Sequence, residues 1–245
     1  MRWLLLALVG CASALGTPQP ISTMAHASGR SADDLVKDGD AAIAARDFQK
    51  AQELYLDAAG ADETRVDAVI GAMKAIAWRI EHEKVDKLAL AEKEVSLGQW
   101  CGKRAPGNAE CDYRLAIAIG QQARERTATG KDAMDRMVAL LKNASKKAPE
   151  LDGGAPHRVL AIVYLRAPAW PMGPGDPEAA LDEAKAAVTI KSTAENQLTL
   201  GEAYAANDQT DAAKQAYGKA LGLARESKDP DAGQWAKQAE EGLRK

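Results

Sequence analysis

The residue types that most often do chemistry in proteins do not form a complete catalytic or metal-binding motif in this chain. The three histidines, His26, His82 and His157, lie far apart in the sequence. The run that starts at His82 reads H-E-K-V-D, and a zinc-protease motif would need a second histidine where Asp86 stands. We find no nucleophile elbow, P-loop or dinucleotide-binding glycine pattern. We therefore expect no catalytic residue, no bound metal and no cofactor.

Cys101 and Cys111 are suited to a different chemistry, oxidation to a disulfide. The residues between them are rich in glycine and proline, which predicts a turn-rich linker between two helices. In an exported protein, which the amino terminus indicates, a disulfide is the usual state of such a pair. Closing a loop of about eleven residues would stabilise the fold by ~2.7 kcal/mol through lost unfolded-state entropy. A metal site or redox pair is the alternative, but the C-x-x-C spacing and a neighbouring histidine are missing.

The amino terminus has the pattern of an export signal. Arg2 supplies a positive charge, residues 3–9 are an unbroken apolar run, and Leu-Val-Gly-Cys ends at Cys11. These last four residues resemble the lipobox of bacterial lipoproteins, in which the cysteine is acylated and becomes the first residue after cleavage. The resemblance implies a signal peptide at residues 1–10 and a membrane anchor at acylated Cys11, on the periplasmic face of a bacterial membrane.

An ordinary secretory signal is the alternative at this end of the chain. Cleavage after Ala27 would then discard Cys11 and release a soluble periplasmic protein. For the lipoprotein, residues 11–30 are polar and lack a helical period, which predicts a flexible tether. About twenty such residues have a root-mean-square reach of roughly 25 Å. Both interpretations predict export.

Small and aromatic residues recur at the same offsets in three stretches, with a period of about 34 residues. Two helices approach closely where one presents glycine or alanine to a ring on the other, so these positions predict the packing of helix pairs. The pattern resembles the tetratricopeptide helix-turn-helix repeat, which implies a solenoid that binds other proteins. The residues expected at these contacts are Gly39, Ala51, Tyr55 and Ala58; Ala180, Ala184 and Ala187; and Gly201, Tyr204, Ala213, Tyr217 and Ala220.

Composition supports an all-α fold. Aromatic residues make up 4% of the chain, so burial depends on aliphatic side chains at helical spacing. The net charge of −3 comes from interspersed charges, and we do not expect nucleic acid as a partner. We expect a tetratricopeptide-like α-solenoid of about five helix pairs over residues 31–228 and a capping helix in residues 229–245. The expected pairs are 35–59 as a whole, 66–80 with 84–100, 112–126 with 132–147, 156–166 with 177–190, and 194–206 with 210–225.

The turn of the fourth pair is about seven residues longer than that of the fifth. Three prolines stiffen this insert at residues 166–175, and Trp170 and Met172 give it an apolar side. It would form either the lip of a hydrophobic pocket or a plug over the ends of neighbouring helices. The candidate ligand or partner residues here are Tyr164, Arg166, Pro168, Trp170, Pro171 and Met172.

The runs 152–160, 164–168 and 175–180 resemble the T component that accompanies some tripartite ATP-independent periplasmic (TRAP) transporters. That family consists of exported lipoproteins built from tetratricopeptide-like helix pairs with a hydrophobic channel. The resemblance implies a periplasmic solute-binding protein as partner and a hydrophobic small ligand, and the family's tendency toward trimers implies a homo-oligomer. The alternative function is a general envelope-assembly scaffold that holds peptide segments of other proteins in its groove.

Overall fold

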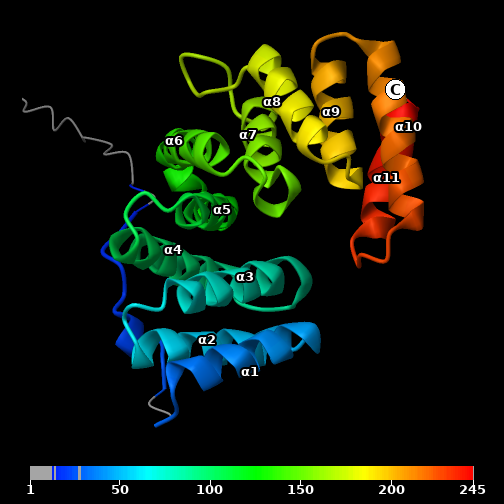
Figure 1. The fold of residues 1–245 in the computed structure, drawn as a ribbon. Helices are drawn as coiled ribbons and strands as arrows, with labels where there is room; N and C mark the ends of the chain where they lie inside the picture. The colour runs from blue at the N-terminus through cyan, green and yellow to red at the C-terminus, as the bar shows by residue number, and fades with distance from the viewer. Residues whose placement is uncertain (1–12, 14, 27–28, 245) are drawn as a thin grey trace, which may run out of the picture.

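The protein is a curved stack of antiparallel helices. The computed structural model describes residues 13, 15–26 and 29–244. In this part of the chain eleven α-helices follow one another, and each packs against the next (Figure 1). Their bounds are α1 Ala32–Ala44, α2 Phe48–Ala61, α3 Val66–His82, α4 Lys87–Arg104, α5 Ala109–Glu125, α6 Gly130–Lys147, α7 Ala155–Arg166, α8 Pro177–Ile190, α9 Ala194–Ala206, α10 Thr210–Glu226 and α11 Ala232–Leu243.

Polar side chains set many of the helix starts. At each of six starts, an oxygen of the residue before the helix accepts a hydrogen bond from a backbone N–H of the first turn, which satisfies a donor that the helix leaves free. These residues are Ser31, Asp47, Asp86, Asn108, Asp176 and Thr193. Pro156 and Pro177 occupy the first turns of α7 and α8, where a missing N–H costs nothing.

A tyrosine between two glycines joins the first two helix pairs. Tyr55 of α2 is 5% exposed, and its ring lies against Gly39 of α1 and Gly71 of α3. A Cβ atom built on Gly71 would lie 2.7 Å from the Tyr55 ring, and one on Gly39 would lie 2.8 Å from it. The glycines therefore allow the ring to fill the space between α1, α2 and α3.

The same arrangement occurs at the other end of the stack. Tyr217 of α10 lies between Gly201 of α9 and Gly242 of α11, and a Cβ atom on either glycine would come within 2.6 Å of the ring. Gly242 belongs to the last helix, so α11 packs on α10 as the next helix of the stack would. The small residues expected at the contacts are all buried: Ala51, Ala58, Ala180, Ala184, Ala187, Ala213 and Ala220.

The segment expected to be a flexible tether is packed against the helices over residues 15–26. Ile21 is 5% exposed and Met24 is 8% exposed, and both belong to the core that runs from α1 to α6. The Trp100 indole N–H donates to the carbonyl of Gln19 at 2.8 Å, and the Gln19 N–H donates to Ser96 at 3.3 Å. The tether expectation is wrong for these residues because two apolar side chains and several hydrogen bonds hold the segment in place. Residues 1–12, including Cys11, lie outside the described part.

The cysteine pair lies at the junction of α4 and α5. Cys101 and Cys111 form a disulfide with their Cα atoms 5.4 Å apart. The linker between the two helices is shorter than expected, because α4 continues to Arg104 and α5 already begins at Ala109. The disulfide thus joins the last turns of one helix to the first turn of the next. Among the described residues, no helix is both long and apolar enough to cross a membrane.

Candidate functional site

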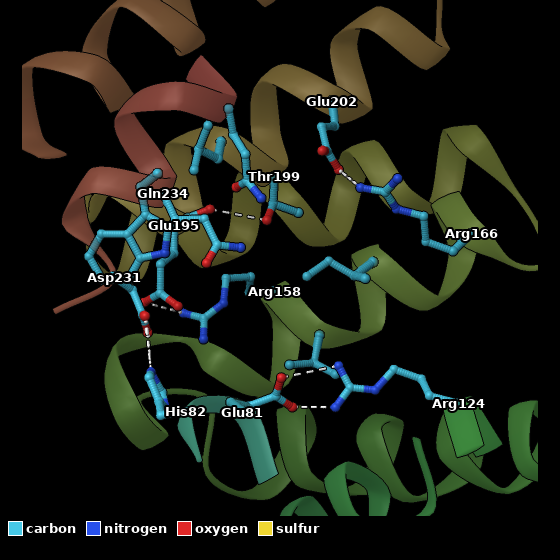
Figure 2. A pocket seen from close by; sticks show the side chains of 15 residues that line it. Glu81, His82, Arg124, Arg158, Arg166, Glu195, Thr199, Glu202, Asp231 and Gln234 are labelled. Carbon is cyan, nitrogen blue, oxygen red and sulfur yellow. Dashed lines mark hydrogen bonds and ion pairs between the residues drawn. The ribbon is translucent and has the colours of Figure 1, made fainter. Parts of the chain in front are cut away.

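The stack curves so that its first half and its last helices face one another. In Figure 1, α1 to α4 lie across the lower part of the view, α7 and α8 lie near its top centre, and α9 to α11 run down its right side. Side chains of α3, α5, α7, α9 and α11 enclose a cavity of about 550 Å³ between them (Figure 2). Eight of its fifteen lining residues carry a group that can be charged, and we call this cavity the charged half of the groove.

Arginine and glutamate side chains pair around the charged half. Arg158 of α7 lies 3.3 Å from Glu195 of α9, and Arg166 of α7 lies 2.7 Å from Glu202 of α9. These pairs connect two helices that are not consecutive in the chain. Each pair is partly exposed to the groove. A carboxylate of a ligand can therefore replace the glutamate beside the arginine, or a cation of a ligand can replace the arginine, at a modest cost in free energy.

A third pair lies on the opposite wall. Glu81 of α3 accepts hydrogen bonds from Arg124 and from the side-chain amide of Gln121, both on α5. Burial raises the pKa of Glu81, but the bonds from Arg124 and Gln121 outweigh burial and hold the pKa below its usual range. By contrast, burial raises the pKa of Glu195, and Arg158 offsets only part of that effect. Protons therefore bind more readily at Glu195 than at Glu81.

An apolar cavity of about 490 Å³ adjoins the charged half, and we call it the apolar half of the groove. Its walls come from one face of α6, with Met134 and Met137, and from Ile117 of α5 and Val163 of α7. Methionine side chains adapt to ligands of different shape. Four residues line both halves, so the two cavities form one surface: Glu81, Arg124, Ile162 and Arg166.

His82 and Asp231 close one end of the charged half. The His82 ring is stacked on Trp78 with ring centroids 4.3 Å apart, and Trp78 is stacked on Phe48 at 3.8 Å. Nε2 of His82 lies 3.0 Å from Asp231, the residue before α11 (Figure 2). Burial lowers the pKa of His82, but the Trp78 carbonyl and Asp231 together raise it above its usual value.

The structure separates the candidate ligand or partner residues that the sequence placed in and just before the 166–175 insert. Tyr164 is buried in the core, and Arg166 lines both halves of the groove. The carbonyl of Pro168 accepts a bond from the Gly175 N–H at 2.8 Å, which closes the base of the loop. Trp170 is 86% exposed and Met172 is 70% exposed, and neither lines the two halves of the groove. Pro171, between them, is also exposed.

The groove is not evident from the sequence. Its arginines and glutamates lie on helices far apart in the chain, and each alone has the pattern of a solvated helix face. The spacing of Arg158, Ile162 and Arg166 at four-residue steps on α7 was the available signal, because it places them on one side of that helix. Among the described residues, no group of three or more potential metal ligands comes together.

Comparison with solved structures identifies proteins with a similar fold. A thermophilic TPR protein of Thermus thermophilus superposes with a TM-score of 0.63 at 21% identity, covering 85% of this chain and 98% of that one. The fold is that of a tetratricopeptide-repeat solenoid. MamA matches with a TM-score of 0.54 at 18% identity, covering 81% of this chain and 94% of its own. YrrB, described as a TPR protein with an unusual peptide-binding site, matches with a TM-score of 0.53 at 13% identity, covering 91% and 98%. No family model matches the sequence, and no curated protein matches it significantly.

Proposed function

We propose that this chain is a protein-interaction scaffold whose groove binds a segment of a protein partner. One observation carries the proposal: a charged cavity and an apolar cavity share a wall formed by Glu81, Arg124, Ile162 and Arg166. An amphipathic segment would place an apolar side chain among the methionines of α6 and its polar side chains among the ion pairs. No covalent step is needed, because the groups at the site recognise a ligand through shape and charge.

We further propose that the scaffold is an exported lipoprotein and that its partner is the solute-binding protein of a TRAP transporter. Support for export comes from the lipobox-like sequence that ends at Cys11. Support for the transporter comes from the resemblance of the runs 152–160, 164–168 and 175–180 to the T component. The apolar half of the groove also has a volume suited to a hydrophobic small ligand, as that resemblance implies.

A charge placed in the apolar half tests the groove. Met134→Asp places a carboxylate in the apolar half of the groove. When an apolar side chain of the partner binds there, this carboxylate would be buried. We expect the Kd to rise roughly tenfold or more, because burying such a side chain contributes about 1.5–3 kcal/mol. The matched control is Ala139→Asp, an exposed position of the same helix that lies outside the groove. Equal affinity of the two variants would refute the proposed site.

Photo-cross-linking in intact cells identifies the partner. A photoreactive amino acid replaces Ile162, which lines both halves, and in a second strain it replaces Ala139. Capture of a solute-binding protein at position 162 but not at 139 would support the transporter function. Capture of neither a transporter component nor any other defined protein segment at position 162 would contradict the scaffold proposal.

A general envelope scaffold is the second candidate. YrrB, which has a similar fold, is described as having a peptide-binding site, and the groove here has the size and mixed polarity for a peptide. Cross-linking at position 162 to extended segments of several envelope-assembly proteins, with no transporter component, would favour this function.

A further inference from the structure

The loop between α7 and α8 presents two large apolar side chains to solvent. Trp170 and Met172 are the large hydrophobic residues that stand exposed among the described residues, at 86% and 70%. The loop is held rigid at its base, where Gly175 bonds to Pro168 and the Asp176 N–H donates to the Tyr164 carbonyl at 3.1 Å. Because the loop is already ordered, burying these side chains against a partner or a membrane costs little additional conformational entropy.

This loop lies at the same edge of the molecule as the start of the described chain. Ser13 donates a hydrogen bond to Asp132, in the first turn of α6, at 3.3 Å. Gly130, the first residue of α6, lines the same cavity as Ala167, where the loop begins. Figure 1 shows the described start of the chain and the α7–α8 loop on the same side, with the α10–α11 turn at the far end.

The position of Ser13 limits how far an anchor can hold the protein from a membrane. Cys11 precedes Ser13 by two residues, which span at most about 7 Å when fully extended. Because residues 15–26 are packed on α2 to α4, they supply no further slack. Acyl chains on Cys11 would therefore bring the edge that carries Ser13 and the α7–α8 loop to the lipid headgroups.

We propose that Trp170 and Met172 insert into the lipid headgroup region beside the anchor, as a second membrane contact that fixes the orientation of the groove. This inference rests on the lipoprotein part of the proposed function. Tryptophan has an apolar body and a polar N–H, and it prefers the interface between hydrocarbon and water. An anchor at Cys11 alone would leave the helical stack free to rotate on the membrane. A second contact at the same edge would keep the groove facing a partner.

Both side chains that make the proposed contact, Trp170 and Met172, are apolar. Charged residues at this edge form local pairs of opposite sign: Lys131 lies 3.0 Å from Asp135, and Arg136 lies 2.8 Å from Asp132. Each of these two pairs joins one positive and one negative group, so the pairs add no net charge. We therefore expect the loop to enter a neutral phosphatidylcholine surface, and added phosphatidylglycerol to change the contact little.

Brominated lipids test the insertion directly, because bromine near the top of the acyl chains quenches an indole that lies at the boundary between headgroups and hydrocarbon. The full chain carrying Cys11→Ser and Ser13→Cys is coupled to phosphatidylcholine vesicles that contain a maleimide lipid, with or without brominated phosphatidylcholine. This chemical link holds the same edge at the membrane whether or not cells acylate Cys11. The fluorescence of Trp170 is taken as the difference between this chain and its Trp170→Phe variant.

We expect brominated lipid to remove most of the Trp170 fluorescence. The matched control is Trp235 of α11, which lines the groove; its contribution, obtained from Trp235→Phe, should persist. An unquenched Trp170 would overturn the inference and leave the loop as a contact for protein. Mass spectrometry of Cys11 from cells tests the anchor separately, so failure of the lipoprotein proposal and failure of the membrane contact give different results.

Discussion

His82 and Asp231 connect α3 to α11 across the groove, although they are 149 positions apart in the chain. Nδ1 of His82 lies 2.8 Å from the Trp78 carbonyl oxygen, and Nε2 lies 3.0 Å from a carboxylate oxygen of Asp231. Both partners accept hydrogen bonds, so both ring nitrogens can donate only when the imidazole is protonated. This contact is therefore strongest when His82 carries a charge.

The first prediction concerns the pH dependence of this contact. The folded protein raises the pKa of His82, so the contact stabilises the fold fully below the unfolded pKa of about 6.5 and less as pH rises through the folded pKa. Asp231→Asn should lower the pKa of His82, measured by NMR titration of the ring proton. It should also cost up to about 1 kcal/mol at pH 6 and nothing at pH 9, since both groups are partly exposed.

Glu240→Gln is the control for this experiment, because Glu240 lies on the same helix and pairs with Arg225 instead. It should leave the titration of His82 unchanged. If Asp231→Asn also leaves that titration unchanged, His82 and Asp231 do not interact in solution.

The second prediction tests the glycines that hold Tyr55. Gly71→Ala adds a Cβ atom 2.7 Å from the ring, so either the ring or α3 must move. We expect a loss of about 1–3 kcal/mol in the free energy of unfolding, the usual cost of overpacking. Gly222→Ala is the matched control, because its Cβ atom would meet nothing within 4 Å and it lies inside helix α10. That variant should gain roughly 0.5–1 kcal/mol from helix propensity. Urea denaturation measures both, and a neutral Gly71→Ala would contradict the packing.

The helices could be predicted from the sequence because their signals are local. Ser31, Asp176 and the first-turn prolines mark helix starts, and Gly201 with Tyr217 marks a packed pair. The groove could not be predicted, since it depends on the rotation of α7 and α9 relative to α3. That rotation accumulates from one helix to the next and leaves no mark at a single position.

The amino-terminal segment shows a second limit of sequence reasoning. Residues 15–26 are polar and rich in turn-forming residues, which is typical of a tether. Two apolar side chains, Ile21 and Met24, join the core of α1 to α6, and hydrogen bonds to α2 and α4 hold the rest of the segment. The surface on which these residues pack exists only in the folded protein. The composition of the segment therefore does not indicate that the segment is packed.

The third prediction follows from this packing. Ile21→Ala should lower the free energy of unfolding by about 2–4 kcal/mol, because it leaves a cavity in the core. Ser22→Ala is the control, since Ser22 is exposed, and it should change stability little. Cleavage after Ala27 would remove Ile21 and Met24 together, so we expect the mature protein to retain both. Mass spectrometry of the protein purified from cells measures its first residue, and a start at Ser28 would contradict the expectation.

The fourth prediction concerns Glu94 of α4, which is fully buried and has no hydrogen-bond partner for either carboxylate oxygen among the described residues. Burial raises the pKa of Glu94 well above its usual value, and Arg114 offsets only part of this effect. A raised pKa means that the folded protein holds a proton that the unfolded chain releases, so stability falls as pH rises above about 4.3.

Glu94→Gln removes the titration and should be more stable than the original chain at pH 8, with a smaller difference at pH 5. The control is Glu92→Gln, at a partly exposed position two residues away that pairs with Arg126. Urea denaturation at both pH values measures the effect, and a gain at pH 8 no larger than at pH 5 would show that Glu94 is not protonated on folding.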